Sequence, residues 1–277
     1  MYFYQVANVF DQVESISSRL EITQRLAEIF AHASPQEAEI VANISLGLLH
    51  APYRGTQFNL STTSVIPIVA DVLGLSVQQI KTYAQSAGDI GSVLAEHAAW
   101  QTTIVLSVQD VYAQLQQIEQ ESGTGSQERK AVLLKRLLLD LDHVSAKFIV
   151  RIIIGKLRLG FSDMTLIDAF SWMAIGDKSL RETIEDAYNM CADIGFIIKL
   201  LKSEGIEAIR AMQVHVGIPI RPAGAERLPS AEAIIKKLGN CVAQPKLDGF
   251  RLQIHIDKRD ADSDGIIHFF SRNLQDM

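Results

Sequence analysis

A lysine whose neighbours suit covalent catalysis stands near the C-terminal end of the sequence, in the run Ala243-Gln-Pro-Lys-Leu-Asp-Gly-Phe-Arg251. An ordinary lysine has a pKa of about 10.4 and is protonated at neutral pH, so a nucleophilic lysine needs burial or neighbouring cations that lower its pKa. Arg251 and Arg272 could supply that positive field and could also contact phosphate. The pattern therefore predicts a nucleophile at Lys246.

The residues after this lysine alternate in the manner of a strand. Leu252, Ile254 and Ile256 are separated by polar or charged residues, which is the period of a half-buried strand. The reactive amine would then stand at the head of a rigid element. A hairpin turn with a solvated lysine is the alternative interpretation, but it does not account for Arg251 or for Ser271-Arg-Asn273.

The chain resembles an ATP-dependent DNA ligase of the archaeal and eukaryotic replicative type in four features: Lys246-Leu-Asp-Gly249, Arg251, the strand that follows and Ser271-Arg-Asn273. The resemblance implies that Lys246 takes AMP from ATP and that Arg251 and Arg272 belong to the nucleotide pocket. The family usually has a glutamate where this chain has Gln244, which keeps a carbonyl acceptor for the adenine amino group but lacks the charge.

The same resemblance implies that the protein seals nicks in double-stranded DNA through a lysine-AMP intermediate, with Mg²⁺ neutralising the polyphosphate. Such an enzyme of DNA replication, repair or recombination would be intracellular and monomeric. In the family, further motifs that include a carboxylate motif and an aromatic residue follow the Ser-Arg-Asn segment, whereas this sequence stops at Met277. We therefore expect the N-terminal part of a ligase, with little or no sealing activity by itself.

Two other functions remain open. An RNA ligase or a capping-type nucleotidyltransferase would use the same lysine, although the long helical region in front of Lys246 speaks against this class. A non-catalytic helical DNA-binding module would carry Lys246 incidentally. Sealing of nicked DNA compared with nicked RNA distinguishes the first alternative, and labelling by ATP distinguishes the second.

Two glycine-flanked turns resemble the turns by which the family's helical domain grips the duplex backbone from the minor-groove side. One comprises Gly88, Asp89 and Gly91, and the other comprises Gly155, Lys156, Arg158 and Gly160. Each turn precedes an expected helix, whose N-terminal N–H groups can bind phosphate, and the second turn adds two positive charges. Tight connections between helices are the alternative interpretation.

The elements that carry these turns are expected to be helices, and the fold class to be mainly α. A capping serine followed three residues later by glutamate or glutamine opens helices after Ser34 and Ser76. Further expected helices span 9–31, 108–121, 127–139, 145–154, 163–174, 178–187 and 192–202.

The prolines and glycines around 212–229 indicate a domain boundary, which we place between a helical DNA-binding domain, 1–212, and the truncated start of an α+β adenylation domain, 213–277. Val214 to Val216 could form a strand. A short helix from Ser230 to Leu238, ended by Gly239, should precede a hairpin of strands near 251–257 and 266–270. These strands would expose an uncovered apolar face.

The composition limits the possible classes of protein. A chain of 277 residues with 48% hydrophobic residues can bury a sizeable core, and its apolar runs are too short to span a membrane. The net charge of −6 argues mildly against a nucleic-acid partner, but Lys147, Arg151, Lys156 and Arg158 form a local basic strip. The two cysteines lack metal-ligand spacing, and Asp260 to Gly265 is expected to be an acidic hairpin tip and not a calcium loop.

Overall fold

The computed structural model describes residues 1–222, 224, 226–245, 247–258 and 266–277. The expected nucleophile Lys246 and the expected acidic hairpin tip, Asp260 to Gly265, lie outside the described residues.

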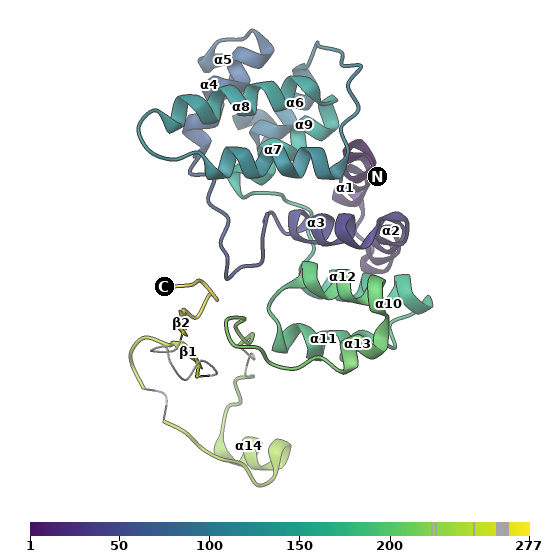
Figure 1. Cartoon of the computed structure of the whole chain (residues 1–277), viewed down its shortest axis with the longest axis vertical. Helices are drawn as coiled ribbons and strands as arrows, with labels where there is room; N and C mark the ends of the chain where they lie inside the picture. The colour runs from purple at the N-terminus through teal and green to yellow at the C-terminus, as the bar shows by residue number, and fades with distance from the viewer. Residues whose placement is uncertain (223, 225, 246, 259–265) are drawn as a thin grey trace.

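The described chain is mainly helical and ends in a two-stranded antiparallel hairpin, which confirms the expected fold class (Figure 1). Its elements are α1 Phe3–Ser15, α2 Arg19–His32, α3 Pro35–Ser45, α4 Thr62–Leu73, α5 Val77–Ala87, α6 Ile90–His97, α7 Val108–Gln120, α8 Ser126–Asp140, α9 His143–Ile154, α10 Asp163–Ile175, α11 Arg181–Met190, α12 Ile194–Glu204, α13 Ile206–Arg210, α14 Ala231–Leu238, β1 Gln253–Asp257 and β2 Ile266–Phe270.

Side-chain caps fix where many helices begin. Ser34 and Ser76 form the expected capping boxes of α3 and α5. In each, the serine hydroxyl accepts the backbone N–H of the third helical residue, and the side chain of that residue accepts the backbone N–H of the serine. The single helix expected over 9–31 is wrong, because α1 ends at Ser15 and a second helix begins after it. Ser18 accepts the backbone N–H of Glu21 at 3.4 Å and so starts α2 as a separate helix.

One hydrophobic core joins two groups of helices. In Figure 1, α4 to α9 lie in the upper part of the molecule, and α10 to α13 lie below with α2 and α3 between. Phe10 of α1 meets Phe148 of α9 edge-on at 5.5 Å between ring centroids, and Phe30 of α2 meets Phe170 of α10 at 5.0 Å. The aromatic pairs connect helices far apart in sequence and hold α9, which carries one of the two glycine turns, in the centre.

A connecting segment, 213–221, joins the helical body to the hairpin. The strand expected at Val214 to Val216 is wrong, because these residues pair with neither described strand, and the His215 carbonyl instead accepts the Ile218 N–H in a turn. Gln253 of β1 both accepts from the Ile220 N–H and donates to the Ile220 carbonyl, and His255 accepts from the Gly217 N–H at 3.1 Å. These bonds use the ring and amide of the strand face that turns inward.

The hairpin turns its apolar face outward. Cross-strand partners His255 and His268 share the inner face with Phe270, whose ring is buried and lies edge-on to Tyr53. On the other face Ile254 is 56% exposed and Ile256 is 50% exposed, in agreement with the expected uncovered apolar face. Because the polar face is docked, the alternation of β1 has its apolar residues in solvent.

No single helix in the described part of the chain is long and apolar enough to cross a membrane; the pair α4 and α5, bent by 108°, passes only a joint test of length and composition.

Candidate nucleic-acid interface

The turn after α9 presents two cations to solvent. Gly155 ends the helix with a φ of 71°, a left-handed conformation that glycine adopts at little cost. The next residues alternate between buried and exposed side chains, since Leu157 and Leu159 pack into the core while Lys156 and Arg158 point out. The two leucines therefore hold the turn onto the protein and orient its positive charges outward.

The turn after α5 begins a helix with an exposed glycine. Gly88 has a φ of 85° and closes α5, and Asp89 caps α6 by accepting the Ser92 backbone N–H at 3.1 Å. Gly91 is buried, and a Cβ built there would lie 2.7 Å from the Lys147 carbonyl oxygen of α9. Gly91 thus serves the close approach of α6 to α9, whereas Gly88 faces solvent.

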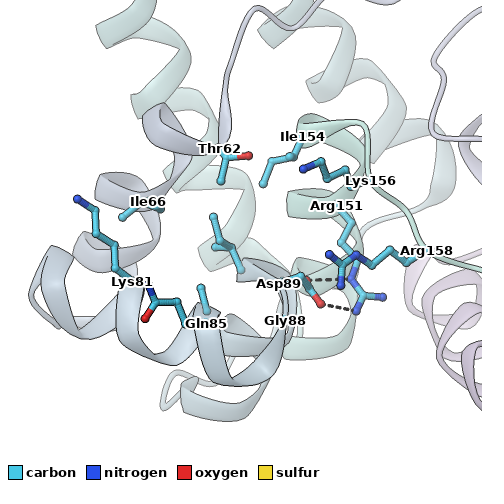
Figure 2. A pocket seen from close by; sticks show the side chains of 13 residues that line it. Thr62, Ile66, Lys81, Gln85, Gly88, Asp89, Arg151, Ile154, Lys156 and Arg158 are labelled. Atoms are coloured by element: carbon cyan, nitrogen blue, oxygen red, sulfur yellow. Dashed lines mark hydrogen bonds and ion pairs between the residues drawn. The ribbon is translucent and has the colours of Figure 1, made fainter.

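The two turns line a single cavity of about 330 Å³, which Figure 2 shows from close by. A Cβ built on Gly88 would lie 3.5 Å from Nη1 of Arg158, so the turns are neighbours although Gly88 and Gly155 are 67 positions apart in the sequence. Exposed Lys81, Lys156 and Arg158 add cations to a lining that also contains Ile66, Ala84, Ile90 and Ile154. Gly160 is exposed beyond Arg158.

Lys81 is a cation of this cavity that we did not single out in the sequence. It lies on α5 seven residues before Gly88, which is two helical turns and therefore the same side of the helix. That spacing was the available signal.

Only half of the expected basic strip faces outward. Lys147 donates to Asp11 and to Glu14, each at 2.7 Å, and Arg151 binds Glu14 and Asp89. The contribution expected from these two cations to an outward strip is therefore wrong, because neighbouring carboxylates neutralise them. Burial opposes ionisation of Asp89, but hydrogen bonds from Arg151 and Ser92 outweigh it and lower the pKa of Asp89 to about 2.

The residues expected around the nucleotide are exposed. Gln244 and Arg251 lie in the chain before β1, which begins only at Gln253, and Arg272 lies in the turn after β2. Amide and guanidinium groups suit adenine and phosphate, but the described residues include no group of three or more histidine, cysteine or acidic side chains that could hold a metal ion. The roles of these three residues and of Lys246 stay predictions.

The helical region matches a family of known proteins. The family described as "DNA ligase N terminus" matches residues 2–171, which include both glycine turns. The chain is 34% identical over 276 residues to a probable DNA ligase of Dictyoglomus turgidum, and the aligned residues cover 100% of this chain and 46% of that protein. It is 35% identical over 291 residues to a DNA ligase of Saccharolobus solfataricus, covering 100% of this chain and 47% of the relative.

A third relative, DNA ligase 2 of Thermofilum pendens, is 33% identical over 285 residues, covering 98% of this chain and 46% of that protein. The chain spans about half the length of the curated relatives it matches. The match over 2–171 takes in more than half of the 277 residues and shows the family. The chain therefore belongs to the family defined by the DNA ligase N terminus.

Proposed function

We propose that the helical region binds nicked double-stranded DNA through the two glycine turns, as the DNA-binding part of an ATP-dependent DNA ligase. The observation that carries this proposal is the convergence of Gly88 and the 155–160 turn on one cavity with three exposed cations, Lys81, Lys156 and Arg158. Family membership supports the same substrate.

The chemistry of this surface suits a sugar-phosphate backbone. Lysine and arginine neutralise phosphate, and backbone N–H groups at a helix start add further donors without reading the base sequence. Aliphatic side chains between the cations, such as Ile66 and Ile154, offer an apolar surface against which a sugar can pack. The arrangement thus favours binding to the backbone of any duplex over recognition of one sequence.

The proposed reaction places the nucleotide chemistry at Lys246. Its Nζ would attack the α-phosphorus of ATP, so that a P–N bond forms and pyrophosphate leaves. An oxygen of the 5′-phosphate at the nick would then take AMP from the lysine, and the 3′-hydroxyl would displace AMP to close the strand. Gln244 would accept from the adenine amino group, and Arg251 and Arg272 would contact the ribose or phosphates. Magnesium would neutralise the polyphosphate charge.

DNA binding and strand closure can be tested separately on residues 1–277. Since Gln244, Arg251 and Arg272 are all exposed, they do not form an enclosed nucleotide pocket. We expect this chain to bind a nicked duplex and to show little or no sealing when ATP and Mg²⁺ are added. Robust closure of the nick, measured by denaturing gel electrophoresis, would show that the described arrangement of the nucleotide residues is not the working one.

The binding proposal is tested by titrating a fluorescent nicked duplex with the chain and its Lys156→Ala and Arg158→Ala variants at several salt concentrations. Each variant should bind more weakly, and the slope of log affinity against log salt should become shallower by about 0.9 for each phosphate that the variant no longer neutralises. Lys178→Ala is a matched control, since Lys178 follows the end of α10 opposite to the 155–160 turn and pairs with Asp168 at 2.8 Å. Unchanged binding in both cavity variants would remove the DNA-facing assignment.

A further inference from the structure

Arg151 lies between the two glycine turns and bonds to one of them. It occupies the last turn of α9, four residues before Gly155, and its side chain is 3% exposed. Its Nε donates to Asp89 Oδ1 at 3.1 Å and its Nη2 donates to Asp89 Oδ2 at 2.8 Å, so the guanidinium grips both oxygens of the carboxylate that caps α6 (Figure 2).

Further donors of Arg151 are also engaged. Nη1 and Nη2 bond the two oxygens of Glu14 on α1, each at 2.9 Å, and Nη2 also reaches Ser92 Oγ at 3.2 Å. Lys147 pairs with Glu14 and Asp11, so this cluster has three acids for two bases. A guanidinium held by two carboxylates in an acidic cluster does not recruit a phosphate, unlike exposed Lys156 and Arg158.

The bidentate bond fixes the orientation of one glycine turn relative to the other. Arg151 belongs to the helix that leads into the 155–160 turn, whereas Asp89 belongs to the turn that follows Gly88. A planar guanidinium bonded to both carboxylate oxygens fixes the direction as well as the distance of its partner, which a lysine ammonium cannot do. Gly91 allows this bond by letting α6 approach the backbone of α9 without a Cβ in between.

We infer that Arg151 is a positioning residue for DNA binding, which clamps Asp89 so that the Gly88 turn and the cations of the 155–160 turn face the same sugar-phosphate backbone in fixed register. This inference rests on the proposed function and adds to it a role for Arg151, which lines the cavity but keeps only 3% of its side chain exposed. Asp89, which the sequence pattern placed among the DNA-binding residues, then acts through its bond to Arg151.

The test uses Arg151→Lys, which keeps the charge but removes the fork. Affinity of the whole 277-residue chain for a nicked duplex should fall about tenfold. The salt slope should also become shallower although the net charge is unchanged, because Lys156 and Arg158 no longer reach their phosphates together. Affinity is measured at a temperature at which circular dichroism shows each variant to be folded. A variant that is less stable but still folded should then keep the same slope of log affinity against log salt as the unaltered chain.

A double-mutant cycle with Lys156→Ala separates positioning from independent contact. If Arg151 acts through Lys156, the Lys156→Ala substitution should weaken binding less in the Arg151→Lys chain than in the unaltered chain. Arg181→Lys is the matched control, because Arg181 bonds Asp168 at 2.8 Å in the α10–α11 region and should leave the slope unchanged.

Each result decides the inference. Coupled effects with a shallower slope support it. Unchanged affinity in Arg151→Lys, or weaker binding with additive effects and an unchanged slope, overturns it while leaving the DNA-binding proposal in place. Failure of the unaltered chain to bind the duplex, or full binding by both Lys156→Ala and Arg158→Ala, overturns the proposed function itself.

Discussion

At the scale of single residues, the same residue type has opposite roles according to its neighbours. Lys156 and Arg158 have exposed side chains, whereas Lys147 and Arg151, a few residues earlier, are bound by carboxylates from α1 and from the turn before α6. The sequence shows four bases without an intervening acid, but it does not show that Asp11, Glu14 and Asp89 come from distant segments to meet two of them. The local net charge therefore depends on which residues lie close together in the folded protein, and not only on which are neighbours in the sequence.

Asp89 should make a pH-dependent contribution to stability. Its pKa in the folded chain is about 2, below the ordinary value of 3.8, so the stabilisation is complete above about pH 4 and disappears as the pH falls towards 2. We expect Asp89→Asn, which can still cap α6, to lower the free energy of unfolding by about 2 kcal/mol at pH 7. Urea denaturation at pH 7 and pH 3 checks this, and a variant deficit that does not shrink at pH 3 would contradict it.

At the scale of elements, several helix starts are predictable from the sequence and helix neighbours are not. Capping boxes after Ser34 and Ser76 were recognised because the signal lies within four residues. The break before Ser18 was missed because apolar residues continue through it. The strand expected at Val214 to Val216 is absent for a different reason: the bonds that hold this segment run from the Gly217 and Ile220 backbone to the side chains of His255 and Gln253, which no local pattern reveals.

The site shows the same division between local and distant information. Both glycine turns were expected from their residues, yet their convergence depends on how α6 packs on α9. Buried Gly91 carries that packing, but from the sequence it resembled the exposed glycine at 88. The resemblance to a known family predicts a DNA-binding role for the turns, while the position of Lys81 required the structure.

Gly91→Ala should disturb both stability and DNA binding. The new Cβ would lie 2.7 Å from the Lys147 carbonyl oxygen and 3.0 Å from Arg151 Cγ, so α6 must move away from α9. We expect a loss of about 1–3 kcal/mol in the free energy of unfolding together with weaker binding to a nicked duplex. Chemical denaturation and a binding titration on the same sample measure the two effects.

Gly195→Ala provides a control with the same kind of clash at another helix pair. Its Cβ would lie 2.5 Å from Asn43 Nδ2 and 2.9 Å from the Glu39 carbonyl oxygen, where α12 packs on α3. This variant should lose stability but keep its affinity for DNA when folded. Equal losses of affinity in both variants would show that binding follows global stability and not the packing of α6 on α9.

At the scale of the whole molecule, the helical body and the C-terminal part differ in how they are held. The body has a continuous core, whereas α14 has no buried residue and stands apart at the bottom of Figure 1. The hairpin docks through buried Phe270 and through the side chains that hold segment 213–221. Its outward apolar face adds nothing to its own stability, so the C-terminal part depends on this docking.

Segment 213–221 contacts the helical body as well as the hairpin, and this bears on where the helical domain ends. Arg221 pairs with Asp163 of α10 at 2.5 Å, its backbone N–H bonds the Asn189 carbonyl at 2.9 Å, and its guanidinium lies 4.1 Å from the Tyr188 ring centroid. The boundary placed after residue 212 stays a prediction, and these contacts support moving it to follow Arg221.

Two shortened chains test that boundary. Residues 1–221 should fold and bind nicked DNA like the full chain, because they keep both turns and the Arg221 contacts. Residues 1–212 should be less stable by about 1–3 kcal/mol, since removal of Arg221 leaves Asp163 without its ion pair and Tyr188 without the cation above its ring. Thermal unfolding followed by circular dichroism compares the two, with Arg221→Ala in the 1–221 chain as the matched variant. If 1–212 and 1–221 unfold at the same temperature, segment 213–221 contributes nothing to the helical domain; if 1–221 does not fold, the helical domain requires the hairpin that docks on Tyr53.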